Sequence, residues 1–284
     1  MKHVVTLKNG VAVPALGQGT WYLGDNRSTH DAEIAALRKG IECGMTLIDT
    51  AEMYGNGRSE ALVGEAIRSY PREQIFLVSK VLPSNAGREG MARACEASLM
   101  RCGTDYFDLY IYHWRGSIPL AETVDCLEEL RQQGKIRAWG VSNFDIDDME
   151  ELMRLPGAEH CQVNQVLYHL GSRGIDYSLL PWMEANGIAL MAYCPLAQGG
   201  SLRRDLLTSP ALLRVSKKHA AAPTQILLAW AIRSGHAIAI PRTRQAAHTE
   251  LNAKADRIAL DADDIAVLDA AFPPPTKKMR LDVQ

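Results

Sequence analysis

Short apolar runs alternate with helical patterns eight times along this chain, from about residue 15 to residue 250. Each run is a few residues long, and the segment after it repeats its apolar residues at the spacing of one helix face. Short, continuously apolar strands are typical of a parallel sheet that is covered on both faces. Eight strand–helix units in a chain of 284 residues therefore predict an α/β fold of the (β/α)8 class, the TIM barrel.

The predicted strands lie within residues 15–23, 46–51, 75–81, 106–114, 136–143, 161–168, 189–196 and 237–242. The predicted helices lie within residues 29–44, 59–69, 88–103, 120–134, 145–155, 177–187, 223–235 and 246–255. Thr29 or Asp31 is a suitable N-cap for the first helix, and Gly44 is expected to end it. Ser59 is expected to cap the second helix.

An N-terminal segment lies outside the repeat. Residues 4–14 alternate in polarity around Asn9 and Gly10, a dipeptide that favours a tight hairpin turn. We therefore expect residues 1–14 to form a β-hairpin that closes the N-terminal end of the barrel.

The C-terminal part of the chain also extends beyond the repeat. Asp261 or Asp263 is expected to begin an extra helix over residues 261–272. Residues 273–284 show no periodicity and are expected to form a tail that drapes over the surface. No linker or low-complexity block divides the chain, so residues 1–284 are expected to form a single barrel domain.

Three connections are longer than a barrel requires, namely residues 17–26, 168–176 and 197–220. We expect them to lie over the C-terminal face of the barrel, where such folds have their active sites.

Composition and charge narrow the classes of function. The formal net charge of −2 gives no general attraction to nucleic acid or to acidic membranes. No stretch approaches 18 uninterrupted apolar residues, and the first residues lack the apolar core of a signal peptide, so the cytoplasm is the expected location. The six cysteines form no C-x-x-C pair or zinc spacing, so we expect reduced core thiols and no metal site.

Four polar residues stand at or just past the ends of the second, third and fourth apolar runs: Asp49, Tyr54, Lys80 and His113. Successive strand ends converge on one face of a barrel. There, Lys80 is expected to stabilise the Tyr54 phenolate and lower the pKa of the phenol, while Asp49 keeps the ammonium charged and oriented. His113 is placed to hydrogen-bond a carbonyl oxygen. The set indicates general acid catalysis on a carbonyl group, with Tyr54 as proton donor.

Reduction of a carbonyl also needs a hydride source. No G-x-G-x-x-G follows a strand, so a Rossmann site is not indicated. The later strand ends offer Ser142, Asn143 and Gln165 for a carboxamide and Tyr193 for stacking on a flat ring. The end of the last predicted strand offers Arg242 and Arg244, which suit a phosphate group. His248 lies one or two helical turns beyond them.

The order and spacing of these motifs resemble the aldo-keto reductase family over essentially the whole chain. The matching segments are IDTAEMYGNGRSEALVGEAI, LVSKV, DLYIYHW, WGVSN, VNQVLYH, YCPLAQGG and AIPRT. The segments GQGTWYLG and MAYCPLA are most similar to the bacterial branch that acts on methylglyoxal and other small aldehydes. The resemblance implies a monomeric reductase that uses NADPH, with NADH as a weaker alternative.

The resemblance also implies roles for individual residues. It makes Asp49, Tyr54, Lys80 and His113 the catalytic tetrad. The implied cofactor contacts are Gly19, Thr20, Trp21, Asp49, Ser142, Asn143, Gln165, Tyr193, Pro195, Leu196, Gln198, Ile240, Pro241, Arg242, Thr243, His248 and Asn252. The implied substrate contacts are Trp21, Tyr22, Met53, Tyr54, His113 and Trp114. Aromatic groups at the mouth favour small or flat carbonyl compounds.

The chain departs from the family pattern on the side expected to bind adenosine and phosphate. Arg242 replaces the usual lysine, His248 an arginine, and Leu251 an acidic residue, whereas Asn252 is retained. Cys194 replaces a serine before Pro-Leu. Because histidine is a pH-dependent phosphate partner, we expect a diluted preference for NADPH.

Two other functions fit parts of the pattern. A lyase or aldolase could use Lys80 as a Schiff base, although pairing with Asp49 would make the amine a poor nucleophile. A non-catalytic nicotinamide-binding subunit is disfavoured by the complete set of four polar residues. The segment 197–210, with Arg203 and Arg204, either folds over the cofactor or is solvated surface.

Overall fold

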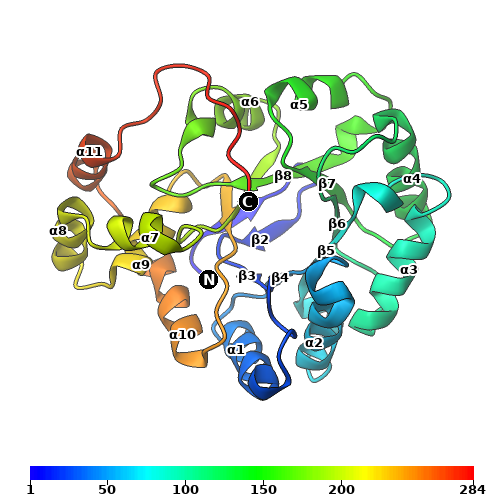
Figure 1. Cartoon of the computed structure of the whole chain (residues 1–284), viewed down its shortest axis with the longest axis horizontal. Coiled ribbons are helices and arrows are strands. Elements are labelled where there is room, and N and C mark those ends of the chain that lie inside the picture. The colour runs from blue at the N-terminus through cyan, green and yellow to red at the C-terminus, as the bar shows by residue number, and fades with distance from the viewer.

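A closed barrel of eight parallel strands forms the centre of the computed structural model, which describes residues 1–284 (Figure 1). The strands are β3 (Gln18–Gly19), β4 (Leu47–Asp49), β5 (Phe76–Val81), β6 (Leu109–Tyr112), β7 (Trp139–Ser142), β8 (Cys161–Leu167), β9 (Ala189–Tyr193) and β10 (Ala237–Ala239). Each pairs with its neighbour in chain order. The backbone N–H of Gly17 donates to Ala239 at 2.9 Å and that of Gly19 to Pro241 at 3.1 Å, which joins the last strand to the first.

Helices surround the strands on the outside of the barrel (Figure 1). Those that follow successive strands are α1 (His30–Glu42), α2 (Arg58–Ile67), α3 (Met91–Cys102), α4 (Leu120–Gln132), α5 (Ile146–Leu152), α6 (Leu179–Ala185), α9 (Pro223–Ala231) and α10 (Ala246–Lys254). Strands β4 to β8 are buried along nearly their whole length because helices cover them on one side and the barrel interior on the other. The predicted (β/α)8 class is confirmed.

The N-terminal hairpin is present as β1 (Val4–Thr6) and β2 (Ala12–Pro14), which pair antiparallel with Val5 opposite Val13. Both of these valines are buried. The backbone N–H of Asn9, in the turn, donates to the side-chain oxygen of Gln162 at 2.8 Å. Because Gln162 stands near the beginning of β8, the hairpin covers the N-terminal end of the barrel and leaves the opposite face open.

Extra helices fill two regions of the C-terminal half. The long connection expected over 197–220 is largely helical, because it contains α7 (Gly200–Leu207) and α8 (Pro210–Lys218), two helices that the sequence patterns did not predict. The terminal helix is α11 (Ala262–Ala271), and Asp261 caps it by accepting from the backbone N–H of Asp264. The tail beyond α11 crosses the C-terminal face toward the barrel axis (Figure 1), where Asp282 accepts from the Ser172 hydroxyl.

The predicted caps of the first two helices are wrong in detail. Thr29 precedes α1, but its hydroxyl donates to the side chain of Glu33 at 2.8 Å rather than capping a backbone N–H. Helix α2 begins at Arg58, after Gly57 in a left-handed conformation (φ 85°). Ser59 therefore lies inside the first turn, and its hydroxyl is buried against the ends of the barrel strands.

Candidate active site

A pocket opens at the carboxyl ends of the barrel strands, and it contains most of the predicted site residues. Its lining comprises Gly19, Thr20, Trp21, Tyr22, Asp49, Met53, Tyr54, His113, Trp114, Ser142, Asn143, Gln165, Tyr193, Cys194, Pro195, Leu196, Ala197, Gln198, Arg203, Ile240, Pro241, Arg242 and Gln284. Lys80 lies directly beneath this lining and has no exposed surface. The structure thus brings together side chains from every strand of the barrel.

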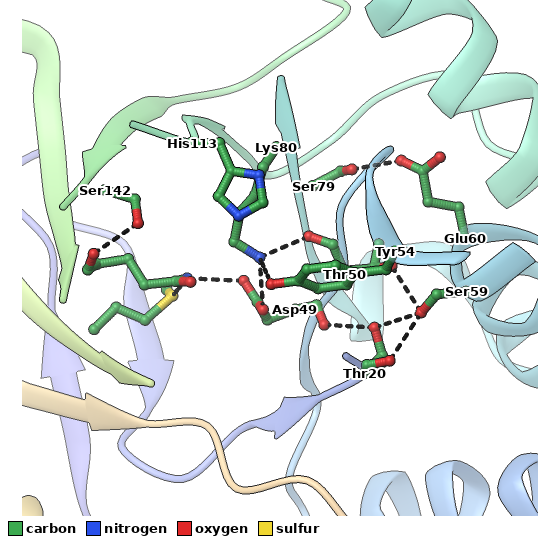
Figure 2. A network of polar contacts seen from close by, with 12 residues as sticks. Thr20, Asp49, Thr50, Tyr54, Ser59, Glu60, Ser79, Lys80, His113 and Ser142 are labelled. Atoms are coloured by element: carbon green, nitrogen blue, oxygen red, sulfur yellow. Dashed lines mark hydrogen bonds and ion pairs between the residues drawn. The ribbon is translucent and has the colours of Figure 1, made fainter. Parts of the chain in front are cut away.

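Lys80 is the centre of the polar contacts at the base of the pocket (Figure 2). Its Nζ atom donates to Asp49 Oδ2 at 2.7 Å, to the Thr50 carbonyl at 2.8 Å and to the Tyr54 hydroxyl at 3.0 Å. An ammonium group has three donors, so all of them are used. Two of these three partners, Asp49 and Tyr54, line the pocket, so Lys80 supports its floor from beneath.

The pKa of the Tyr54 phenol shifts in the direction opposite to the sequence-based expectation. Burial raises the pKa of the Tyr54 phenol well above its usual range, and the nearby charge of Asp49 raises it further. Burial also lowers the pKa of Lys80, against the opposing effect of Asp49. The expected lowering of the phenol pKa is therefore wrong for this structure, and the loss of hydration is the largest cause of the rise. Tyr54 holds its proton at neutral pH, as a general acid must.

His113 lies beside Tyr54 as a neutral imidazole. The two rings meet edge to face, with centroids 5.9 Å apart. Burial and the charge of Lys80 lower the pKa of His113 to about 2. Its Nδ1 atom is buried and has no hydrogen-bond partner. A neutral imidazole carries one N–H group, which it can donate to a carbonyl oxygen.

The predicted carboxamide-binding residues form a connected group at the ends of β7, β8 and β9. The Ser142 hydroxyl donates to the Gln165 carbonyl at 2.7 Å, and the Tyr193 hydroxyl donates to Asn143 Oδ1 at 2.9 Å. Gln165 Nε2 donates to Asp49 Oδ1 at 2.8 Å. Asp49 therefore contacts both Lys80 and the group that would hold a nicotinamide.

Aromatic side chains form the mouth of the pocket above Tyr54. Trp21 stacks on Tyr22 with ring centroids 4.5 Å apart and lies 6.4 Å from the Tyr54 ring. Trp114 lies on the other side, 4.7 Å from His113 between ring centroids. The predicted substrate contacts are therefore adjacent to the proton donor.

The predicted adenosine contacts are only partly brought together. Thr243 and Asn252 line a separate narrow crevice, which shares Gly19 and Pro241 with the pocket. His248 is exposed on α10 and lines neither space. The phosphate side of the pocket is instead lined by Arg242 and by Arg203 from α7.

Gln284 in the tail and Ala197 line the pocket but were not among the predicted site residues. The side-chain oxygen of Gln284 accepts from the Cys194 thiol at 3.7 Å. A tail without periodicity carries no local signal of where it packs, so only the fold reveals this contact.

The structure is a (β/α)8 barrel with Asp49, Tyr54, Lys80 and His113 together at its mouth, and comparison with known proteins gives the family. The sequence model described as the Aldo/keto reductase family matches residues 15–272. The chain therefore belongs to the aldo/keto reductase family.

Individual relatives are similar over nearly their full length. Methylglyoxal reductase YeaE of Escherichia coli is 50% identical over 282 residues, covering 99% of both chains. Glyoxal reductase of Bacillus subtilis is 34% identical over 272 residues, covering 95% of this chain and 93% of the relative. An aldo/keto reductase from Klebsiella pneumoniae, solved in complex with NADP and acetate, is 49% identical, covers 100% of both chains and has a TM-score of 0.97. None of the helices in the present structure has the length and apolar character that a membrane span needs.

Proposed function

We propose that this protein is an NADPH-dependent reductase of small aldehydes and ketones, with methylglyoxal-like compounds as its substrates. The contact between Lys80 and the neutral phenol of Tyr54, 3.0 Å apart, is the observation that carries this proposal. The similarity to a methylglyoxal reductase and a glyoxal reductase supports the substrate class.

The pocket residues fit a nicotinamide cofactor. Side-chain amides of Asn143 and Gln165 lie beside the Tyr193 ring, a combination suited to a carboxamide on an aromatic ring. Arg203 and Arg242 line the same pocket, and neither forms an ion pair with a carboxylate, which suits them to phosphate groups. When bound, the cofactor would supply the hydride from C4 of its nicotinamide.

The protein's own residues would bind and protonate the substrate oxygen. His113 would donate a hydrogen bond to the carbonyl oxygen and orient it toward Tyr54. Tyr54 would give its proton to that oxygen as negative charge develops, and Lys80 would stabilise the phenolate left behind. Trp21 and Trp114 would exclude water and limit the size of the substrate. The burial of Lys80 makes its stabilising effect strong at the moment of proton transfer.

The cofactor preference follows from the phosphate side of the pocket. Arg242 is the residue best placed for a 2′-phosphate, and its planar guanidinium can bind an anion through two donors. His248 lies outside the pocket, so it adds no second contact there. We therefore propose NADPH as the main cofactor and NADH as a weaker alternative.

The Schiff-base alternative is disfavoured by the state of Lys80. All three of its N–H groups are bonded, and its pairing with Asp49 at 2.7 Å keeps it an ammonium without a free lone pair. Borohydride trapping with a carbonyl substrate in the absence of cofactor tests this directly. A covalent adduct on Lys80 would support the lyase, and its absence supports the reductase.

A panel of aldehydes and ketones, assayed with NADPH and separately with NADH, tests the proposed function. We expect turnover of methylglyoxal and other small aldehydes with NADPH, and slower turnover with NADH. Complete absence of NADPH oxidation across the panel would contradict the proposal and favour a non-catalytic nicotinamide-binding subunit. The cytoplasmic location and the monomeric state stay predictions from the sequence, and light scattering would test the second.

A further inference from the structure

Three buried hydroxyl groups next to the tetrad form a closed chain of hydrogen bonds (Figure 2). The Thr50 hydroxyl donates to Ser59 Oγ at 3.2 Å, and the Ser59 hydroxyl donates to Thr20 Oγ1 at 2.8 Å. The Thr20 hydroxyl donates to the Asp49 carbonyl at 2.9 Å. Because Asp49 directly precedes Thr50, this series of hydrogen bonds ends on the residue next to the one where it begins. We call this set the hydroxyl ring.

The direction of these bonds is fixed by the carbonyl at the end. A carbonyl oxygen only accepts, so Thr20 must donate to Asp49. Ser59 therefore donates its one proton toward Thr20, to Oγ1 at 2.8 Å with the Thr20 carbonyl as a second acceptor at 3.1 Å. Ser59 then has no proton left for Thr50 and accepts from it. Thr20, Thr50 and Ser59 each have no exposed surface, so no water competes for these bonds. Buried bonds that run in one direction strengthen each other.

The hydroxyl ring holds the same two residues that hold Lys80. Two of the three acceptors of Lys80 Nζ are the Asp49 carboxylate and the Thr50 carbonyl. The ring bonds other atoms of these residues, namely the Asp49 carbonyl and the Thr50 hydroxyl. A shift of these two residues would therefore redirect the third N–H of Lys80, which points at Tyr54.

Ser59 also fixes the segment that carries Tyr54. Three of the four residues between them, Gly55, Asn56 and Gly57, have positive φ angles of 57°, 53° and 85°. Glycine and asparagine adopt such angles more readily than other residues, so the sequence permits this turn, and bonds to the barrel keep its end in place. The bonds of Ser59 to Thr20 are the first anchors in the barrel after the turn.

The residue after Ser59 anchors the neighbouring strand. Glu60 is fully buried and accepts from the Ser79 hydroxyl at 2.6 Å, and it pairs with Arg101 of α3 at 2.6 Å. Ser79 directly precedes Lys80 on β5. The first turn of α2 therefore contacts β3 and β4 through Ser59 and β5 through Glu60.

We propose that Ser59, which completes the hydroxyl ring, is a positioning residue for proton transfer from Tyr54. It lies outside the pocket lining and contacts neither substrate nor cofactor. The inference rests on the proposed reductase function for its kinetic consequences, but its structural part stands alone. Ser59 acts through the peptide of Asp49 and Thr50 on the orientation of Lys80.

Steady-state and isotope measurements on Ser59→Ala test the proposal. We expect kcat to fall about tenfold, since small displacements of catalytic groups have effects of that size or larger. The Kd for NADPH is expected to stay within about twofold, because Ser59 lies outside the pocket lining and Asn143, Tyr193 and Arg242 make no bond to the hydroxyl ring. The solvent deuterium isotope effect on kcat is expected to rise, since proton transfer becomes more rate-limiting. An unchanged kcat, or a lower kcat with an unchanged isotope effect, would overturn the proposal.

Two further sets of variants separate positioning from loss of folded protein. Thr50→Val removes the hydroxyl at constant shape, whereas Thr50→Ser keeps it, so we expect only Thr50→Val to reproduce the kinetic change. Equal losses in both would overturn the proposal. Ser216→Ala is the matched control, because Ser216 is a buried serine on α8 whose hydroxyl has no partner.

A crystal structure of Ser59→Ala gives a readout independent of activity. We expect the distance from Lys80 Nζ to Tyr54 Oη to lengthen beyond the 3.0 Å of the wild-type chain. An unchanged distance would overturn the positioning role. Absence of NADPH oxidation by the wild-type protein would instead refute the reductase proposal, and this distance would still decide the role of Ser59.

Discussion

Gln165 and Asp49 meet across the mouth of the barrel, with Gln165 Nε2 donating to Asp49 Oδ1 at 2.8 Å. The other oxygen of the same carboxylate accepts from Lys80 at 2.7 Å. One buried carboxylate on β4 thus joins the proton-donating group to the group proposed to bind the nicotinamide. Its two oxygens make these connections in a site where water does not compete.

Asp49→Asn is expected to impair both chemistry and stability. The amide keeps the size of the side chain but leaves the buried ammonium of Lys80 without its counter-charge. Removing one partner of a buried ion pair costs about 3–5 kcal/mol, so chemical denaturation should show a loss of that order. A free energy of unfolding within about 0.5 kcal/mol of wild type would contradict this account of the buried pair.

Lys80→Met is expected to abolish turnover while the chain still binds NADPH. Methionine fills a similar volume but cannot stabilise the phenolate of Tyr54, so the loss of kcat should reach about 10²-fold or more. Fluorescence titration with NADPH measures the binding. Lys277→Met serves as the control, because Lys277 is an exposed lysine of the tail that does not line the pocket. Retained turnover in Lys80→Met would show that the ammonium is not needed.

Stability should depend on His113 in acid. Its pKa in the folded protein is lowered to about 2, below the ordinary value of 6.5, so the unfolded chain binds more protons between these values. The contribution of His113 to stability is therefore complete above pH 6.5 and is lost as the pH falls toward 2. Between pH 6.5 and 5 the wild type should lose about 2 kcal/mol more than His113→Gln. Urea denaturation at several pH values measures this loss, with the exposed His248→Gln as control. The same pH dependence of the free energy of unfolding in wild type and His113→Gln would contradict it.

Arg203 is expected to bind the phosphates of the cofactor. Arg203 and Arg242 line one pocket, and partial burial, followed by the charges of Arg244 and Arg203, lowers the pKa of Arg242. An anion between such cations would relieve their repulsion. Arg203→Gln should weaken NADPH binding about 10-fold or more, the effect of one charge-assisted hydrogen bond.

Arg204→Gln is the matched control for Arg203→Gln, because Arg204 is exposed on the same helix and lies 3.8 Å from Asp205. Its binding of NADPH should be unchanged. Equal losses with NADH and NADPH in Arg203→Gln would assign Arg203 to the pyrophosphate, whereas a loss with NADPH alone would assign it to the 2′-phosphate. Wild-type affinity for both cofactors in Arg203→Gln would exclude the phosphate role.

The sequence predicted those parts of the fold and site that depend on regular spacing. The eight strands and the convergence of Asp49, Tyr54 and Lys80 follow from short apolar runs with polar residues at their ends, which a parallel barrel must bring to one face. The family resemblance added the roles of residues on the later strands. These roles remain proposals that the pocket geometry supports.

The parts that were missed depend on contacts between distant segments. Ser59 has the residue type and position of a helix cap, but long-range bonds to β3 and β4 decide its role instead. The contact of Gln284 with the pocket depends on the path of the tail across the whole barrel. The pKa of Tyr54 depends on its burial, which spacing along the chain does not reveal.

The most direct test of the account is the rate of NADPH oxidation with methylglyoxal by Tyr54→Phe, measured beside its affinity for NADPH. Phenylalanine keeps the ring but removes the proton that lies next to Lys80. We predict a fall in kcat of about 10²- to 10⁴-fold, the range for loss of a general acid, with NADPH binding retained. Turnover close to that of the wild type would contradict the assignment of Tyr54 as the proton donor.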